Sequence, residues 1–245
     1  MSIPSAEDVK ALIRDKYDGV ESSALAGDIA RLAAGEPLAY VIGWVPFLGL
    51  RIDLSSRPLI PRPETEYWTE VLIGELKKRR VPRVLDLCAG SGAIGLAVAK
   101  HVPGATVSFG ELELAHTAQI RKNLELNGVG GTVRRGNLFA PFFDERFDVI
   151  ATNPPYVPEG RTLEESVAAH EPPVALFAGP AGLSVIERIA REAPKHVKPG
   201  GELWMECDVD NIEKARRLVL EDGARRADIR TDQYGRARTL VGYYP

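Results

Sequence analysis

The first forty residues carry apolar positions at helical spacing. Ser5 to Asp8 has the form of a capping box, an arrangement that begins many helices. The apolar residues that follow on one helical face are Val9, Leu12, Ile13 and Tyr17. A second such pattern covers residues 23–34 and ends at Gly35, a residue type common just beyond helix C-termini. The pattern therefore predicts a short helical module over residues 1–40.

The pattern then changes to short apolar runs. Runs at 41–47 and 50–54 predict a β-hairpin, so that residues 41–62 link the helical module to a larger domain over residues 63–245. In that domain a helix over 63–80 comes first. The predicted strands cover 83–87, 106–111, 132–135, 147–152, 202–207, 227–231 and 237–243, and the helices between them cover 93–102, 114–127, 183–197 and 211–221. This alternation predicts an α/β fold with a mostly parallel, seven-stranded, Rossmann-like sheet that ends in an antiparallel hairpin.

Small residues follow the first strand of this sheet. The segment from Asp86 to Gly92 joins strand to helix, where backbone amides approach a ligand at a helix N-terminus. Glu111 ends the next strand and is placed to accept hydrogen bonds from ribose hydroxyls. Gly90, Gly92 and Gly95, with an acid about 20 residues later, also satisfy the dinucleotide fingerprint. On this evidence a nicotinamide nucleotide competes with a nucleoside methyl donor.

Asn153, Pro154, Pro155 and Tyr156 directly follow the predicted strand 147–152. The two prolines fix φ and lack N–H groups, so nearby carbonyls stay free to accept hydrogen bonds from another molecule. Asn153 adds a side-chain acceptor, and Tyr156 offers a flat face for an amide or a base. Alone, the tetrapeptide is also an ordinary turn signal. Together with the glycine-rich turn, the tetrapeptide predicts a substrate with a planar nitrogen. A nicotinamide site would give the tetrapeptide no role.

A third motif, at residues 57–66, indicates a specific protein family. Residues 57–66 read Arg-Pro-Leu-Ile-Pro-Arg-Pro-Glu-Thr-Glu, and with the two motifs above the chain resembles the HemK/PrmC family of protein-glutamine N5-methyltransferases. Further matches lie at 35–40, 170–172, 175–176, 182–183, 199–201, 204–206 and 232–236, so that the resemblance covers residues 31–243. The segment 57–66 separates this family from nucleic-acid amino-methyltransferases, many of which share Asn-Pro-Pro-Tyr.

The resemblance implies the class I S-adenosylmethionine-dependent methyltransferase fold. It implies methylation of the glutamine in the Gly-Gly-Gln motif of class I peptide-chain release factors, with S-adenosylhomocysteine as the product. The implied donor-binding residues are Asp86, Cys88, Ala89, Gly90, Ser91, Gly92, Glu111, Asn137, Leu138 and Asn153. The implied substrate-binding residues are Arg62, Asn153, Pro154, Pro155 and Tyr156, of which the last four are also the expected catalytic group. The chain departs from the family at Cys88, usually glycine, at Glu111, usually aspartate, and at Asn137, usually an acid.

Orientation is expected to drive the chemistry, because an amide nitrogen is a poor nucleophile and the motif holds no strong base. Acceptance of both amide hydrogens, by Asn153 Oδ1 and the Pro154 carbonyl, would aim the nitrogen at the methyl group. We expect no metal, since the four histidines have no metal-ligand spacing. Arg62 either shapes the mouth of the site or is a surface residue paired with Glu64 or Glu66.

Composition narrows the choice of partner. The net charge of −3 and the isoelectric point near 5.9 argue against a protein that grips nucleic acid. Two cysteines, an acid-bearing N-terminus and the lack of a membrane-length apolar run favour the cytoplasm. We therefore expect a monomer that contacts a release factor and neither nucleic acid nor membrane. The alternatives are an N6-adenine type of nucleic-acid methyltransferase and a non-catalytic module that binds the donor.

Overall fold

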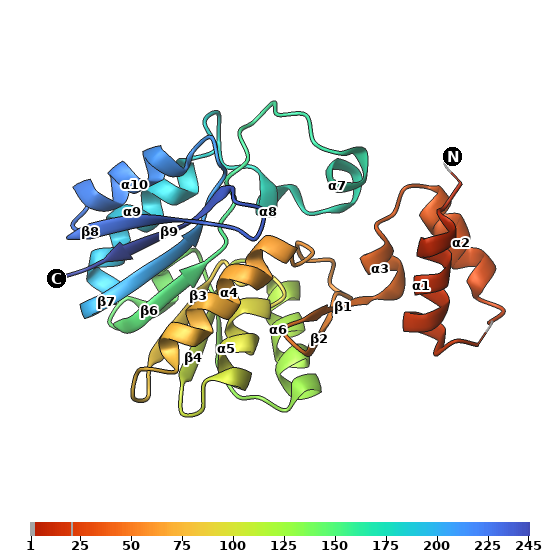
Figure 1. Cartoon of the computed structure of the whole chain (residues 1–245), viewed down its shortest axis with the longest axis horizontal. Coiled ribbons are helices and arrows are strands. Elements are labelled where there is room, and N and C mark those ends of the chain that lie inside the picture. Colours follow the sequence, from red (N-terminus) through yellow and green to blue (C-terminus); the bar gives the residue numbers. More distant parts are fainter. Residues whose placement is uncertain (1–2, 21) are drawn as a thin grey trace.

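The computed structural model describes residues 3–20 and 22–245. Its N-terminal part contains α1 (Ala6–Tyr17), α2 (Leu25–Ala33) and α3 (Leu38–Ile42), which Figure 1 shows together at one end of the molecule, apart from the sheet. Ser5 begins α1 as the capping box predicts, because its Oγ accepts a hydrogen bond from the Asp8 amide at 3.0 Å. Leu12, Leu32 and Val41, one from each helix, form a small core of their own.

The hairpin that follows is shorter than the sequence predicts. Its antiparallel strands are β1 (Trp44–Phe47) and β2 (Leu50–Asp53). Val41 and Ile42 belong to α3, so the prediction of a strand from residue 41 is wrong. Pro37 precedes the helical turn and Gly43, with a φ of 95°, ends it. Burial of Val41 against α1 and α2 outweighs the preference of a Val-Ile pair for strands.

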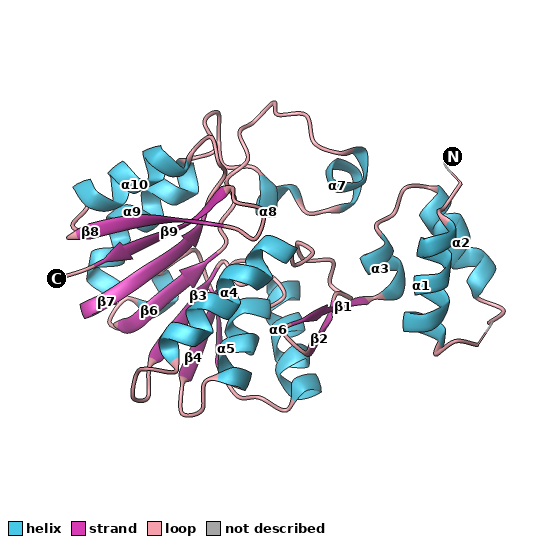
Figure 2. Cartoon of the chain, viewed as in Figure 1, coloured by secondary structure: helices cyan, strands magenta, loops and turns pink. Residues whose placement is uncertain are grey.

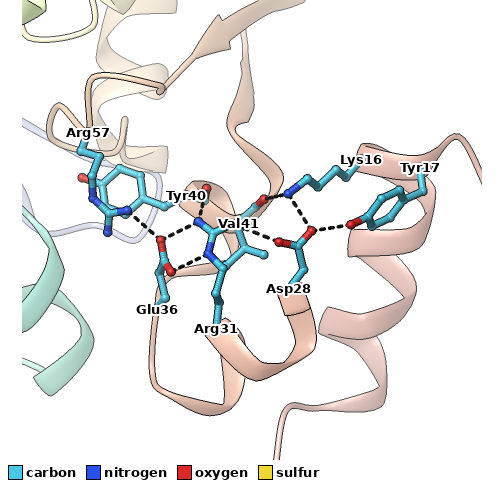
Figure 3. A network of polar contacts seen from close by, with 8 residues as sticks. All are labelled: Lys16, Tyr17, Asp28, Arg31, Glu36, Tyr40, Val41 and Arg57. Atoms are coloured by element: carbon cyan, nitrogen blue, oxygen red, sulfur yellow. Dashed lines mark hydrogen bonds and ion pairs between the residues drawn. The ribbon is translucent and has the colours of Figure 1, made fainter. Parts of the chain in front are cut away.

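A polar network connects α1 and α2 to the chain beyond the hairpin (Figure 3). Its labelled members are Lys16, Tyr17, Asp28, Arg31, Glu36, Tyr40, Val41 and Arg57. The buried Asp28 carboxylate pairs with Lys16 Nζ at 2.6 Å and with Arg31 at 3.0 Å. Glu36 Oε1 lies 2.7 Å from guanidinium nitrogens of both Arg31 and Arg57. Since Arg57 lies beyond β2, Glu36 connects the helical module to the end of the linker that leads into the larger domain.

In the described part of the chain, the central sheet has seven strands in the order β5-β4-β3-β6-β7-β9-β8 (Figure 2). They are β3 (Arg83–Leu87), β4 (Thr106–Glu111), β5 (Thr132–Arg135), β6 (Phe147–Thr152), β7 (Val197–Glu206), β8 (Arg226–Thr231) and β9 (Ala237–Tyr243). Neighbours are parallel from β5 to β7, whereas β9 is antiparallel to both β7 and β8. The prediction of a mostly parallel sheet with an antiparallel C-terminal hairpin is confirmed.

Helices cover both faces of this sheet. One core lies under α4 (Pro63–Leu76), α5 (Ala93–His101) and α6 (Leu114–Asn127), and the other under α9 (Ser184–His196) and α10 (Ile212–Glu221). Val84 belongs to the first core and Leu85 to the second, because successive strand residues point to opposite faces. Both faces of β3 are therefore buried, which explains its unbroken apolar run.

Four features differ from the prediction. The helix that begins at Pro63 ends at Leu76 and not near residue 80, and β7 begins at Val197, where it pairs with Phe147. The segment between β6 and α9 contains two short helices that the sequence did not reveal, α7 (Glu165–His170) and α8 (Pro173–Leu176). A turn of 3-10 helix covers Ala140–Phe142. No helix of residues 3–20 or 22–245 is long and apolar enough to cross a membrane.

Candidate active site

One cavity lies at the carboxyl ends of β3, β4 and β6. Its volume is about 210 Å³. The predicted site residues that line it are Cys88, Gly90, Glu111, Asn137, Leu138, Asn153 and Pro155. Because β3 has β4 on one side and β6 on the other, the cavity lies where the strand order reverses, the usual place for a ligand in an open parallel sheet.

The glycine-rich turn after β3 has a left-handed backbone at three of its residues. Cys88, Gly90 and Gly92 have φ values of 58°, 55° and 82°. At Gly92 an added Cβ would also lie 2.9 Å from Leu96 Cδ1, so both the left-handed φ and this contact favour glycine where α5 begins. Ala89 and Ser91 line a smaller adjoining cavity of about 50 Å³, which Asn153 also lines.

Glu111 holds the turn and the chain after β4 together. Its Oε2 accepts a hydrogen bond from the Gly90 amide at 2.7 Å, and its Oε1 accepts one from the Glu113 amide at 2.9 Å. Burial alone would raise the pKa of this carboxyl, but the hydrogen bonds from His116, Glu113 and Gly90 lower it below its ordinary value. The side chain is therefore a carboxylate with acceptor capacity left for hydroxyl groups in the cavity.

Asp86 lies beneath the turn and does not line the cavity. Its Oδ2 accepts a hydrogen bond from the Gly95 amide at 2.8 Å, so it ties the first turn of α5 to the end of β3. The side chain is fully buried, and burial raises the pKa of its carboxyl well above the ordinary value. Asp86 can act on a ligand only through the turn that it holds.

The opposite end of the cavity has a cation that the sequence did not suggest. Arg188 of α9 donates a hydrogen bond to Asn137 Oδ1 at 3.1 Å, and both residues line the cavity. This contact orients the Asn137 amide. The neighbouring Leu138, with Val185 of α9, gives this end an apolar wall against which a flat ring can pack.

A second, larger cavity of about 420 Å³ lies on the other side of Asn153. Its lining includes Arg62, Asn153, Pro154, Tyr156, Arg161, Asp208 and Arg238. Leu59, Asn153 and Ala175 line both this cavity and the one at the strand ends. The Asn153 side chain therefore lies at the boundary between two spaces, one beside the glycine-rich turn and the other beside Tyr156.

Arg62 has a partner distant in sequence. Its Nη2 lies 2.6 Å from Oε1 of Glu171, whose side chain is almost fully buried, and Glu171 Oε2 accepts a hydrogen bond from the Ile60 amide at 3.1 Å. Neither Glu64 nor Glu66, the partners suggested by sequence, makes this ion pair: Glu64 binds Arg236, and Glu66 accepts from the Leu48 amide. Arg62 thus fastens the chain between α7 and α8 over the second cavity.

Hydrogen bonds hold both polar side chains of the Asn-Pro-Pro-Tyr motif. Asn153 Nδ2 donates to Thr65 Oγ1 at 3.2 Å, and the Tyr156 hydroxyl donates to Glu206 Oε1 at 3.1 Å. Burial, followed by the charge of Glu206, raises the pKa of Tyr156 well above its ordinary value. Tyr156 is therefore a neutral phenol and cannot serve as a base at neutral pH.

Several lining residues were not predicted: Leu59, His116, Val174, Val185 and Arg188. Leu59 falls within the singled-out segment 57–66, but the others lie on helices or short turns whose position against the strand ends no spacing reveals. In the described residues, no group of three or more His, Cys, Asp or Glu side chains is placed to hold a metal ion.

Comparisons with known proteins agree with this geometry. Residues 63–171 match the model of the methyltransferase small domain. The release factor glutamine methyltransferase of Bordetella pertussis is 38% identical over 216 residues, which are 87% of this chain and 80% of that protein. The 4-amino-L-phenylalanine/4-methylamino-L-phenylalanine methyltransferase of Streptomyces pristinaespiralis is also 38% identical, over 73% of this chain and 63% of that protein.

Among solved structures, a 16S rRNA methyltransferase from T. thermophilus in complex with AdoMet and guanosine has a TM-score of 0.61. It is 22% identical and covers 82% of this chain and 50% of that one. At this identity the likeness concerns the fold, which is that of class I S-adenosylmethionine-dependent methyltransferases.

Proposed function

We propose that this chain, which belongs to the release factor glutamine methyltransferase family, methylates the side-chain nitrogen of a glutamine in the Gly-Gly-Gln motif of class I release factors. The methyl donor is S-adenosylmethionine, and S-adenosylhomocysteine is the product. One observation carries the proposal: Asn153 lies at the boundary of two cavities, so a single side chain can contact both a donor and a substrate.

The cavity at the strand ends is the donor site in this proposal. The acceptors and apolar surfaces there fit a nucleoside, because the Glu111 carboxylate suits a ribose diol and Leu138 suits an adenine ring. The residues assigned to the donor are Cys88, Ala89, Gly90, Ser91, Gly92, Glu111, Asn137, Leu138 and Asn153, with Asp86 acting through the turn. The bound donor supplies an activated sulfonium methyl group, and no metal is required.

The protein's part in the reaction is to orient the substrate amide. Asn153 Oδ1 and the Pro154 carbonyl accept the two amide hydrogens, so that the nitrogen lone pair points toward the donor cavity. Tyr156 packs against the plane of the amide and, as a neutral phenol, takes no proton, so the substrate nitrogen releases one of its two N–H protons to water once it is methylated. Orientation of this kind can lower the activation free energy by on the order of 7–11 kcal/mol. Arg62, which is paired with Glu171, lines the substrate cavity.

The partner in this proposal is a folded protein. A class I release factor acts in translation, so in this proposal the reaction takes place in the cytoplasm. The net charge of −3 does not favour binding to nucleic acid or to an anionic membrane surface. We assign partner recognition to the helical module of residues 1–40, and residues 41–62 to a linker before the methyltransferase domain of residues 63–245. The enzyme acts as a monomer in this scheme.

Single-turnover methylation with labelled donor tests the function. The purified chain should label a class I release factor, and it should not label the counterpart in which the motif glutamine is changed to alanine. Asn153→Ala should lower the rate about 100-fold or more, because misorientation of the reacting atoms is that costly. Asn153→Asp should also be damaging, since its added charge retains water in the site.

The same assay separates the alternatives. Labelling of an adenine-containing oligonucleotide would indicate a nucleic-acid enzyme, and labelling of 4-amino-L-phenylalanine would indicate a small-molecule one. Donor binding without any transfer would indicate a non-catalytic module. Equal labelling of the two release factors, or a normal rate for Asn153→Ala, would contradict the amide mechanism.

A further inference from the structure

A buried carboxylate lies behind the Asn-Pro-Pro-Tyr motif. Glu206 is the last residue of β7 and is 1% exposed. Met205 is paired with Thr152 across β6 and β7, so the next residues, Glu206 and Asn153, lie side by side at this end of the sheet, where Glu206 still pairs with Thr239 of β9. The mechanism proposed above gives Glu206 no role, although its surroundings contain both polar side chains of the motif.

Three donors converge on this carboxylate. Thr65 Oγ1 and Trp68 Nε1, both from α4, lie 2.6 and 2.8 Å from Oε2, and the Tyr156 hydroxyl lies 3.1 Å from Oε1. Burial raises the pKa of the Glu206 carboxyl, but the hydrogen bonds from Thr65, Trp68 and Tyr156 oppose this rise and favour the carboxylate, so Oε2 is an acceptor for both Thr65 and the indole N–H, which can only donate. The Thr65 hydroxyl has a single proton, and at 2.6 Å from this acceptor it directs that proton to Glu206.

The Asn153 amide is oriented as a consequence. With its proton committed to Glu206, Thr65 Oγ1 can only accept from Asn153, whose side chain lies 3.2 Å away. The Asn153 nitrogen therefore faces Thr65, and Oδ1 must face the opposite side. In the reverse orientation Oδ1 would meet a lone pair of Thr65 and no proton, which leaves two acceptors in contact.

We propose that Thr65, held by Glu206, is a positioning residue that sets the orientation of the Asn153 amide, so that Oδ1 and not Nδ2 is presented to the substrate nitrogen. This rests on the proposed function. Substrate NH₂ hydrogens need an acceptor, and an Asn153 amide turned by 180° would oppose them with a donor. Thr65 also lines the small cavity of about 50 Å³ beside the glycine-rich turn, but its hydroxyl is engaged by Glu206 and Asn153, so in this scheme it acts through Asn153.

The chain offers a matched control for a test at Thr65. Thr69 lies one turn further along α4, is fully buried, and donates from Oγ1 to the Thr65 carbonyl at 2.7 Å. Its hydroxyl reaches neither Asn153 nor Glu206. Thr69→Val and Thr65→Val therefore both remove one buried hydroxyl from the same helix, but only Thr65→Val removes the partner of Asn153.

The kinetic test compares Thr65→Val, Thr65→Ser and Thr69→Val. Thr65→Val should lower kcat at least about tenfold while donor affinity changes less than about threefold, because Thr65 does not line the larger cavity that holds Glu111, Asn137 and Leu138, and valine keeps the volume of threonine. Thr65→Ser keeps the hydroxyl and should recover kcat to within about threefold of the parent chain, and Thr69→Val should keep it. A normal kcat for Thr65→Val, or equal losses for Thr65→Val and Thr69→Val, would overturn the proposal.

A second measurement does not depend on activity. In protein labelled with ¹⁵N-asparagine, the Asn153 NH₂ signals are identified by their loss in Asn153→Ala. These protons should exchange slowly with solvent in the parent chain, Thr65→Ser and Thr69→Val, and at least about tenfold faster in Thr65→Val. Unchanged exchange of the Asn153 NH₂ protons in Thr65→Val would refute the proposed role of Thr65, whether or not a release factor is methylated. Failure of the parent chain to transfer a methyl group would refute only the proposed function.

Discussion

Cys88 is an L-residue in a conformation that suits glycine. Its φ of 58° is in the left-handed region, which costs a residue with a Cβ roughly 1–2 kcal/mol. The resemblance to the family led us to expect glycine here, and this backbone angle is a physical reason for that expectation. Burial raises the pKa of the Cys88 thiol to about 12, so the side chain behaves as a small neutral group on the cavity wall.

This backbone angle leads to a prediction about stability. The free energy of unfolding should be about 1 kcal/mol larger for Cys88→Gly than for Cys88→Ala, since only alanine keeps the strained Cβ. Urea unfolding of Cys88→Gly and Cys88→Ala measures the difference. Cys207, buried but without a positive φ, is the control: there alanine should be the more stable. If the alanine variant is more stable than the glycine variant at both positions, the explanation from the backbone angle is wrong.

Glu111 should contribute to donor affinity. Glu111→Ala removes the acceptor proposed for the ribose and also frees the Gly90 and Glu113 amides that it now binds. We expect donor binding to weaken by about 1–3 kcal/mol, the cost of unsatisfied buried partners. Calorimetry with S-adenosylhomocysteine measures this, with NAD as the ligand that should not bind. Saturable NAD binding, or unchanged affinity of the variant, would count against the assignment.

Among the elements, those whose evidence is local were predictable. Strands such as Thr106–Glu111 were predicted to the residue, because apolar content and flanking turns are readable from a short window. The helices α7 and α8 were not, because each is too short to show a periodic pattern. The contacts of Arg62 with Glu171 and of Arg188 with Asn137 were also missed. They join residues 109 and 51 positions apart, and only the folded chain brings these together.

The ion pair between Arg62 and Glu171 should stabilise the chain that covers the substrate cavity. Arg62→Ala leaves a nearly buried carboxylate without its cation, so we expect a loss of about 1–3 kcal/mol in the free energy of unfolding. The double variant with Glu171→Gln should recover part of this loss, because the remaining group is neutral. Urea unfolding of the single and double variants provides the cycle. Strictly additive effects would show that the pair is not coupled.

At the scale of the whole molecule, the helical module is fastened close to the site. Glu36 bridges Arg31 of α2 and Arg57, and Arg57 packs over the Tyr40 ring at 4.5 Å (Figure 3). Two residues beyond Arg57, Leu59 lines the donor and the substrate cavities. The sequence suggested a linker between module and domain, but the ion pairs across it could not be read from spacing.

The Glu36 bridge predicts a pH dependence of stability. Hydrogen bonds from Arg31, opposed by burial and supported by Arg57, lower the pKa of Glu36 from 4.5 to about 2. A pKa lower in the folded state means that the stabilisation is full above pH 4.5 and is lost as the pH falls toward 2. Glu36→Gln should therefore cost about 1 kcal/mol at pH 7 and progressively less as the pH falls through 2, where half of the Glu36 side chains are still ionised.

The check is the free energy of unfolding in urea, measured for the parent chain and for Glu36→Gln from pH 7 down to the lowest pH at which both chains are folded. The matched control is Glu75→Gln, which breaks an exposed ion pair between Glu75 of α4 and Lys78 just beyond the helix, and should change stability by less than about 0.5 kcal/mol at any pH. Parallel stability curves for Glu36→Gln and the parent chain would show that Glu36 does not fasten the module. Convergence of the two curves at low pH would show that its charge does.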